Sequence, residues 1–163
     1  MLRKLLAAIT IMILVVSCAD TSDPNQRKVF RISNKDVAKI QLRHLDSINA
    51  LRVASGLSPV ELSPQLTAAA KTHAIDISRQ NRPWHFGSDG SNPIERVERT
   101  GYAGRMLSEN ISETFESDLE TLQAWMRDPT TRSGILHPDA RYMGFSWHQE
   151  PIGKIWWVEV LGS

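Results

Sequence analysis

The chain of 163 residues has almost no cysteine: Cys18 is the only one. A single cysteine excludes disulfides within the chain, and the domain after Cys18 has no thiol nucleophile. The sequence also lacks an HExxH motif, paired cysteines and a GxSxG turn. A zinc site therefore gains no support from a motif, and no serine is presented as the nucleophile of a hydrolase.

A surplus of positive charge is also missing. The chain has 19 basic and 18 acidic residues, and removal of an N-terminal segment with Arg3 and Lys4 leaves 17 basic against 18 acidic ones. Proteins that bind nucleic acid depend on a basic surface that pairs with phosphates. The charge balance therefore argues against nucleic acid as a partner.

The chain has no apolar run long enough for a membrane-spanning helix. Leu5 to Val16 is almost unbroken in its hydrophobicity, but a spanning helix needs about 20 such residues. Because Arg3 and Lys4 precede it, the run is typical of a signal peptide, predicted here as residues 1–17. An ordinary cleaved signal peptide followed by an incidental cysteine is the alternative to the lipid anchor considered next.

The sequence Val15-Val16-Ser17-Cys18 resembles a bacterial lipobox, in which the cysteine is acylated and becomes the new N-terminus. This predicts a lipid on Cys18 that attaches the protein to a membrane. Ala19 lacks the aspartate that marks retention in the inner membrane of enteric bacteria, so the outer membrane is favoured over the inner membrane. Residues 18–33 are polar and predicted to form a flexible tether with a reach of about 20 Å.

The remaining residues, 34–163, are predicted to form one domain. Apolar periodicity and capping residues predict long helices over 34–55, 64–81 and 118–127. Residues 105–112 are predicted to be extended, residues 133–136 to form a short turn, and residues 141–149 and 154–161 to pair as a β-hairpin. This order predicts an α+β fold in which helices pack on an antiparallel sheet.

The segment from His85 to Ile111 places a histidine before a loop rich in glycine, serine, aspartate and asparagine. Ser91 or Asn92 can cap a short helix after the loop, and Glu109 follows in an isolated acidic position. A histidine and a glutamate on either side of such a segment could meet at one cleft.

The ordered set of residues resembles the CAP superfamily, also called SCP-like domains, in its bacterial branch without disulfides. The resemblance covers roughly residues 40–162 and rests on Leu66 to Asp76, His85, Asp89-Gly90-Ser91, Glu95-Arg96, Gly101-Tyr102, Glu109-Asn110-Ile111, Trp125, Pro129, Arg132, Ile135-Leu136, Gly144 and Trp157-Val158-Glu159-Val160. It implies a three-layer α-β-α sandwich with a cleft that faces solvent.

In that family the cleft is often lined by two histidines and two acidic residues, and in some members it holds zinc or another divalent metal. The resemblance places His85 at the first histidine, Glu109 at the first acid and Asp128 at the second acid. Thr131 occupies a position where bacterial relatives commonly have a histidine. Arg141 occupies the histidine position of the eukaryotic type, and neither residue is a good metal ligand. His137 is close in sequence and could substitute.

The candidate residues allow more than one role. Zinc needs three or four ligands, so His85 and Glu109 with Asp128 and His137 could form a metal site; alternatively, His85 and Glu109 only hydrogen-bond each other and fix the loop. His73 lies on the apolar face of its helix and is predicted to be a core histidine. His44 has no acidic residue in a context that suggests a site.

Two functions follow from the resemblance. The first is a lipid-anchored protein of the cell envelope that binds a lipid, a cell-wall fragment or a protein partner in the cleft, as family members have been linked to lipid or sterol binding. The second is a metal-assisted hydrolase, a peptidase or cell-wall hydrolase, that uses His85 and Glu109, since proteolysis has been proposed for some relatives. Thr131 at a histidine position favours the first.

Overall fold

The computed structural model describes residues 29–163. The predicted signal peptide, Cys18 and the first part of the predicted tether lie outside the described residues. In chain order the elements are η1 (Asn34–Asp36), α1 (Val37–Ala54), β1 (Glu61–Leu62), α2 (Pro64–Gln80), α3 (Pro93–Glu98), β2 (Met106–Ser112), α4 (Asp118–Arg127), α5 (Pro129–Ile135), β3 (Tyr142–Gln149) and β4 (Ile155–Gly162).

A sheet of four strands in the order β1-β3-β4-β2 forms the middle of the molecule. β3 and β4 pair as an antiparallel hairpin, and β2 pairs antiparallel with β4. The antiparallel arrangement predicted for the late strands is therefore correct. The two-residue strand β1, which was not predicted, adds a parallel pair with β3 and makes the sheet mixed. β2 is an edge strand, and this leaves one side of it open.

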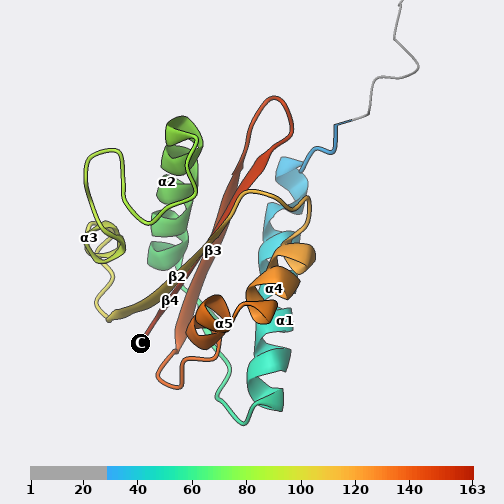
Figure 1. The fold of residues 1–163 in the computed structure, drawn as a ribbon. Coiled ribbons are helices and arrows are strands. Elements are labelled where there is room, and N and C mark those ends of the chain that lie inside the picture. Colours follow the sequence, from blue (N-terminus) through green and yellow to red (C-terminus); the bar gives the residue numbers. More distant parts are fainter. Residues whose placement is uncertain (1–28) are drawn as a thin grey trace, which may run out of the picture.

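Helices cover both faces of the sheet, with α2 and α3 on one face and α1, α4 and α5 on the other (Figure 1). Side chains of β4 alternate between the two layers, as the geometry of a strand requires. Trp156, Val158 and Val160 pack with α2, whereas Trp157 and Leu161 pack with α1 and α4. The predicted three-layer α-β-α sandwich is confirmed.

Side-chain caps explain where the helices begin. Ser63 accepts a hydrogen bond from Leu66 N at the start of α2, and Asn92 forms a capping box with Glu95 at the start of α3. The helix α5 is not predicted from the sequence, because Asp128-Pro129 after a helix is also typical of its end. The short turn expected at residues 133–136 is instead the last turn of α5 with its C-cap. Asp128 instead accepts from the N–H groups of the next turn, and Pro129 occupies the first helical position, where a missing N–H costs nothing.

A close contact between α2 and the sheet depends on Gly144 in β3. A Cβ atom at this position would overlap the backbone of Leu66 and Thr67 in α2. Ala70 and Ala74 on the same helix face are fully buried, so small side chains bring α2 close to the strands. The loop that follows α2 is consequently held near the sheet.

Residues 29–33, the last part of the predicted tether, lie against the β3–β4 hairpin. Gln149 accepts from Ile32 N at 3.0 Å and donates to Phe30 O at 2.8 Å. These two hydrogen bonds attach residues 30–32 to the hairpin. Within residues 29–163, no helix is both long and apolar enough to cross a membrane.

Candidate functional site

The structure brings His85 and Glu109 together at the open side of β2. His85 lies in the loop after α2, and Glu109 lies in the middle of β2. His85 Nδ1 is 2.9 Å from Glu109 Oε1. The His85 side chain is 55% exposed, whereas the Glu109 side chain is only 3% exposed. The histidine therefore offers its outer ring nitrogen to solvent, and the glutamate lies behind it.

Arg96 of α3 neutralises this buried glutamate. Its Nη2 donates to both carboxylate oxygens of Glu109, at 2.9 and 2.8 Å, and its Nη1 donates to His85 O and Ser91 O. A hydrogen bond between a guanidinium and a carboxylate is stronger than one between neutral groups. Arg96 was matched by resemblance but given no role, because nothing in its local sequence shows which acid it meets.

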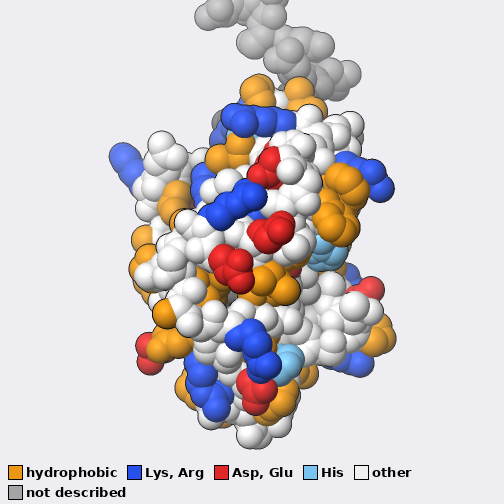
Figure 2. All heavy atoms as spheres, turned by 90° about the vertical axis from the view of Figure 1, so that its left-hand side faces the viewer, with side chains coloured by type: hydrophobic (Ala, Val, Ile, Leu, Met, Phe, Trp, Pro, Cys, Tyr) orange, Lys and Arg blue, Asp and Glu red, His pale blue; other side chains and the backbone are white. Residues whose placement is uncertain are grey.

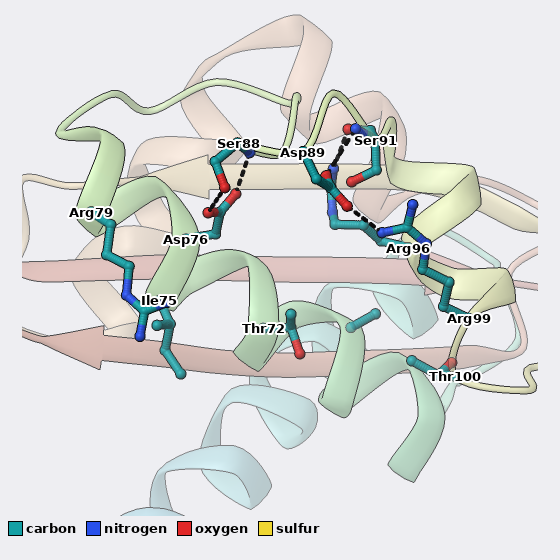
Figure 3. Close-up of a pocket in the computed structure, with 11 residues that line it drawn as sticks. Thr72, Ile75, Asp76, Arg79, Ser88, Asp89, Ser91, Arg96, Arg99 and Thr100 are labelled. Atoms are coloured by element: carbon teal, nitrogen blue, oxygen red, sulfur yellow. Dashed lines mark hydrogen bonds and ion pairs between the residues drawn. The ribbon is translucent and has the colours of Figure 1, made fainter.

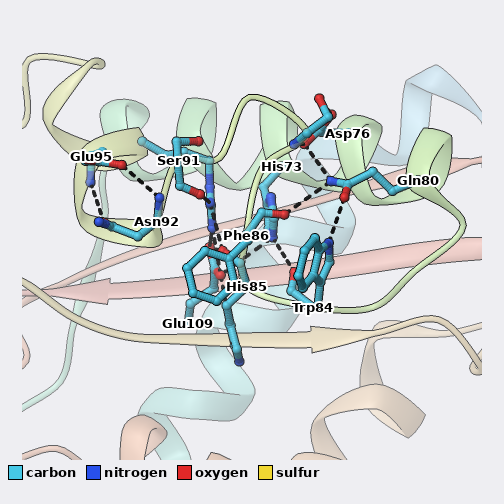
Figure 4. A network of polar contacts seen from close by, with 12 residues as sticks. His73, Asp76, Gln80, Trp84, His85, Phe86, Ser91, Asn92, Glu95 and Glu109 are labelled. Atoms are coloured by element: carbon cyan, nitrogen blue, oxygen red, sulfur yellow. Dashed lines mark hydrogen bonds and ion pairs between the residues drawn. The ribbon is translucent and has the colours of Figure 1, made fainter.

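His73 of α2 completes the polar cluster from the side of that helix (Figure 4). Its Nε2 is 2.9 Å from Trp84 O and 3.7 Å from Glu109 Oε1. Because a carbonyl oxygen only accepts, Nε2 carries the hydrogen and donates it to Trp84 O. Burial lowers the pKa of His73, an effect that Glu109 opposes and Arg96 reinforces. His73 is fully buried, as predicted for a core histidine.

A groove of about 490 Å³ runs along β2 in front of this cluster. Residues 106–111 of β2 form its floor; one wall contains Pro83, His85 and Pro93, and the other contains Thr130, Thr131, Ser133, Gly134 and His137. Ile111 O accepts a hydrogen bond from Trp125 Nε1, on the side of β2 that faces away from β4. Alternate residues of a strand present their N–H and C=O groups on the same side, so the backbone of Glu109 also faces the groove.

The other predicted site residues divide between the groove and its support. His137 lines the groove, and its Nδ1 accepts from Asp139 N at 3.2 Å. Thr131 also lines it, with its hydroxyl donated to Trp125 O. Asp128 is not among the lining residues, since its carboxylate caps α5 by accepting from Thr130 N at 2.7 Å. The structure thus places His85, Glu109 and His137 at one groove and gives Asp128 a structural role.

The residues present do not fit a zinc site. Zinc in proteins takes three or four nitrogen, oxygen or sulfur ligands. Within residues 29–163, no group of three His, Cys, Asp or Glu side chains is arranged to hold a metal ion. Both oxygens of Glu109 are also occupied by Arg96, whose positive charge opposes a second cation. We therefore derive no catalytic step through a metal.

A second polar pair, which the sequence did not suggest, lies beneath the groove. His44 of α1 and Glu159 of β4 are both fully buried, and His44 Nε2 is 2.9 Å from Glu159 Oε2. The ring of His44 stacks on Phe145 with centroids 3.7 Å apart. Asn110 donates to Glu159 Oε1 at 3.1 Å and to Thr131 O at 3.3 Å. This chain of contacts connects α1 to the wall of the groove.

Arg52 of α1 fixes the connection between α5 and β3. Its guanidinium is fully buried and donates to Ile135 O at 2.7 Å, His137 O at 3.0 Å and Ala140 O at 3.1 Å. Burial lowers the pKa of Arg52, and the positive charge of Arg141 adds to this effect. Three carbonyl groups of one loop are thereby satisfied by one side chain, which positions His137 at the groove.

A second groove, of about 550 Å³, lies between α2 and the loop that precedes α3 (Figure 3). Asp76 accepts hydrogen bonds from the backbone N–H of Ser88, at 2.7 Å, and from the Ser88 hydroxyl. Asp89 accepts hydrogen bonds from Ser91 and Arg99, which hold its pKa well below the usual range. These contacts fix the loop that also carries His85. We assign the candidate site to the groove along β2, because the histidine and glutamate side chains converge there.

Comparisons with known families agree with this architecture. The family model described as "CAP: Cysteine-rich secretory protein family" matches residues 45–161. Among curated proteins, the chain is 24% identical over 127 residues to the uncharacterized protein YkwD of Bacillus subtilis, a match that covers 78% of the chain. It is also 23% identical over 123 residues to the uncharacterized membrane protein YlbC of the same organism, covering 76% of the chain. The matches span 49% and 34% of those two relatives.

Solved structures show the same fold at low sequence identity. An outer surface protein from Borrelia burgdorferi superimposes with a TM-score of 0.72 at 17% identity, covering 83% of this chain and 98% of that one. An extracellular protein with an SCP domain from Bacillus anthracis superimposes with a TM-score of 0.67 at 17% identity, covering 82% of this chain and 45% of that one. The relatives with these structures are described as outer surface or extracellular proteins.

Proposed function

The chain belongs to the cysteine-rich secretory protein (CAP) family, and from this premise we propose that it is a lipid-anchored protein of the cell envelope that binds a ligand in the groove along β2. One observation carries the proposal. The Glu109 carboxylate is 3% exposed and is already bonded by His85 and, through both of its oxygens, by Arg96 Nη2. Such a group can hold the groove in shape, and its burial behind His85 and Arg96 leaves little of it within reach of a substrate.

The groove presents hydrogen-bonding groups without a strong charge. Hydroxyl groups of Thr130 and Ser133, the outer nitrogen of His85, and the backbone edge at Glu109 surround the same space. An open strand edge pairs best with a chain that carries alternating N–H and C=O groups. These features favour a ligand with amide bonds, such as the peptide part of a cell-wall fragment, over a purely apolar lipid.

The alternative function is a metal-assisted hydrolase that uses His85 and Glu109. A general base must reach the proton that it removes, directly or through one water molecule. Arg96 Nη2 bonds both oxygens of Glu109, and the described residues contain no group of three side chains arranged to hold a metal ion. These contacts count against the hydrolase.

Calorimetric titration of residues 19–163 with cell-wall stem peptides, and separately with zinc, tests the proposal. We expect a peptide to bind and to remain intact. His85→Ala should weaken this binding at least about tenfold, because it removes one hydrogen bond and the contact area of the ring. His148→Ala, which changes a histidine outside the groove, is the matched control and should bind as the parent does. Peptide cleavage that disappears in His85→Ala and Glu109→Gln, with unfolding temperatures unchanged, would establish the hydrolase instead.

The membrane anchor has its own test. The lipobox-like sequence before Cys18 supports acylation of that cysteine, and the outer membrane is the proposed destination. Fractionation of cells that express Cys18→Ser should then find the protein in the soluble fraction, whereas the parent protein floats with membranes. A parent protein that is equally soluble would refute the anchor and leave the groove proposal intact.

A further inference from the structure

The described chain begins beside the tip of the β3–β4 hairpin, and hydrogen bonds hold it there. Arg31 donates to Glu150 O at 2.7 Å and also to Pro151 O, so its guanidinium bonds the backbone of the hairpin turn. Gln149 fixes the backbone of residues 30 and 32 from the other side. The N-terminal segment and the hairpin tip therefore form one surface.

Large apolar side chains are exposed on this surface. Ile152 at the hairpin tip is 75% exposed, and Phe30 and Val29 are 49% and 45% exposed. The three residues and Phe115 line one notch of about 350 Å³, and we call these four residues the hairpin-end patch. Figure 2 shows hydrophobic side chains with Lys and Arg at the end of the molecule where the described chain begins. Exposed apolar clusters of this kind usually mark a binding surface.

The charges around the hairpin-end patch are largely paired. Lys154 is 2.6 Å from Glu113 and lies over the ring of Trp156, and Arg31 is used by backbone carbonyl groups. The exposed Glu116 also borders the notch. Among the described residues, no group of unpaired like charges lies beside the patch to attract a strongly charged partner. An apolar surface with a mixed rim of charges suits the headgroup region of a lipid bilayer.

The position of the patch in the chain identifies the lipid surface. Only ten residues separate Cys18 from Val29, and they span at most about 35 Å when fully extended and about 18 Å as a flexible coil. A lipid on Cys18 therefore keeps the hairpin-end patch close to the bilayer, at a high effective concentration. The patch is also the part of the described domain that comes first after the anchor.

We propose that the hairpin-end patch rests on the lipid surface and fixes the orientation of the domain on the membrane. This inference relies on the proposed anchor at Cys18. Glu109 pairs with Val160, five residues along β4 from Ile155 at the hairpin, so the groove lies about 17 Å from the patch. The proposed contact thus leaves the groove clear of the lipid and open to ligands from the opposite side.

The test uses the full acylated chain in phosphatidylethanolamine/phosphatidylglycerol vesicles, with a fluorescent label on Ile152→Cys or on Asp139→Cys. Cys18 is blocked by its lipid, so each variant has one reactive thiol. We expect nitroxide-labelled lipid to quench the label at position 152 and not the label at position 139. Phe30→Ser should shift the equilibrium between contact and release about tenfold toward release, from the loss of one partly inserted side chain.

Ile94→Ser is the matched control, because Ile94 on α3 is 54% exposed but lies away from the hairpin; it should leave the quenching unchanged. Equal quenching at positions 152 and 139, or quenching that Phe30→Ser does not reduce, would overturn the proposal. Quenching by a second labelled copy but not by lipid would assign the patch to self-association, which also overturns it.

Failure of the anchor can be distinguished from failure of the patch. If the chain is not acylated and does not float with vesicles, the anchor is wrong. The same fluorescence measurement is then made on a chain held to nickel-chelating lipid by a histidine tag in place of residues 1–18. Quenching at position 152 in that experiment supports the patch on its own, and its absence refutes it.

Discussion

Replacement of His44 by leucine should destabilise the domain by about 2 kcal/mol. Breaking a buried ion pair by removing one partner costs about 3–5 kcal/mol, because the other charge stays buried without compensation. Here the partner is Glu159, which is fully buried and keeps only its bond from Asn110. The loss is partly offset, since His44 Nδ1 is buried without a hydrogen-bond partner in the described residues, and removing such a group recovers about 1–3 kcal/mol.

A double-mutant cycle with Glu159→Gln isolates the charge. Glutamine keeps one oxygen that can accept from Asn110, and its amide N–H can donate to His44 Nε2 in the other imidazole tautomer, so Glu159→Gln alone should cost about 1 kcal/mol. In the double variant the leucine no longer faces a buried charge, and most of the stability lost in His44→Leu should return. His148→Leu, on the partly exposed end of β3, serves as the control and should change stability by about 0.5 kcal/mol or less.

Urea unfolding followed by circular dichroism measures these differences, and thermal unfolding should show a fall of about 8 °C for His44→Leu in a domain of this size. The reasoning would be refuted if His44→Leu were as stable as the parent. It would equally be refuted if the double variant were less stable than His44→Leu, because the buried charge would then not be the source of the loss.

Three further predictions concern pH, packing and a helix cap. Burial holds the pKa of His73 below its ordinary value of 6.5, so the unfolded chain binds more protons than the folded one at acidic pH. Stability should therefore be retained above about pH 6.5 and fall as the pH drops from there through the lowered pKa of the folded state. Urea midpoints measured against pH should fall less steeply in His73→Gln. Gly144→Ala should cost about 3 kcal/mol or more, measured by proteolysis, because its Cβ would overlap the backbone of Leu66. Asp128→Ala should cost about 1 kcal/mol through its lost bond to Thr130 N, leaving peptide binding in the groove unchanged.

Local signals explain why most helices and strands were predictable. The start of α2 at Ser63 and the pairing of the last two strands depend on neighbouring residues and agree with the structure, which also selects Asn92 over Ser91 as the cap of α3. The helix α5 was missed because proline after Asp128 is compatible both with the end of one helix and with the start of another. The strand β1 was missed because two residues carry no detectable period.

The site was only half visible for a different reason. His85 and Glu109 stand out because each is isolated in a polar context, but Arg96 is one of many arginines, and its partner depends on how α3 packs against β2. His44 and Glu159 are 115 residues apart, and neither sequence neighbourhood indicates the other. Each of the two residues occupies a position that the apolar pattern of its helix or strand assigns to the core. Because an unpaired charge is not tolerated in the core, these positions could have indicated that the two side chains pair.

The strand order has a consequence for when the protein can fold. β3 and β4 lie at the centre of the sheet, with β1 and β2 paired to their outer sides, yet they come from residues 142–162. A nascent chain that has not yet reached these residues has helices with nothing to pack on and edge strands with no partner, so it cannot close its core. Folding therefore waits until residues 142–162 have been made, so the order of synthesis delays closure of the core until the end of the domain.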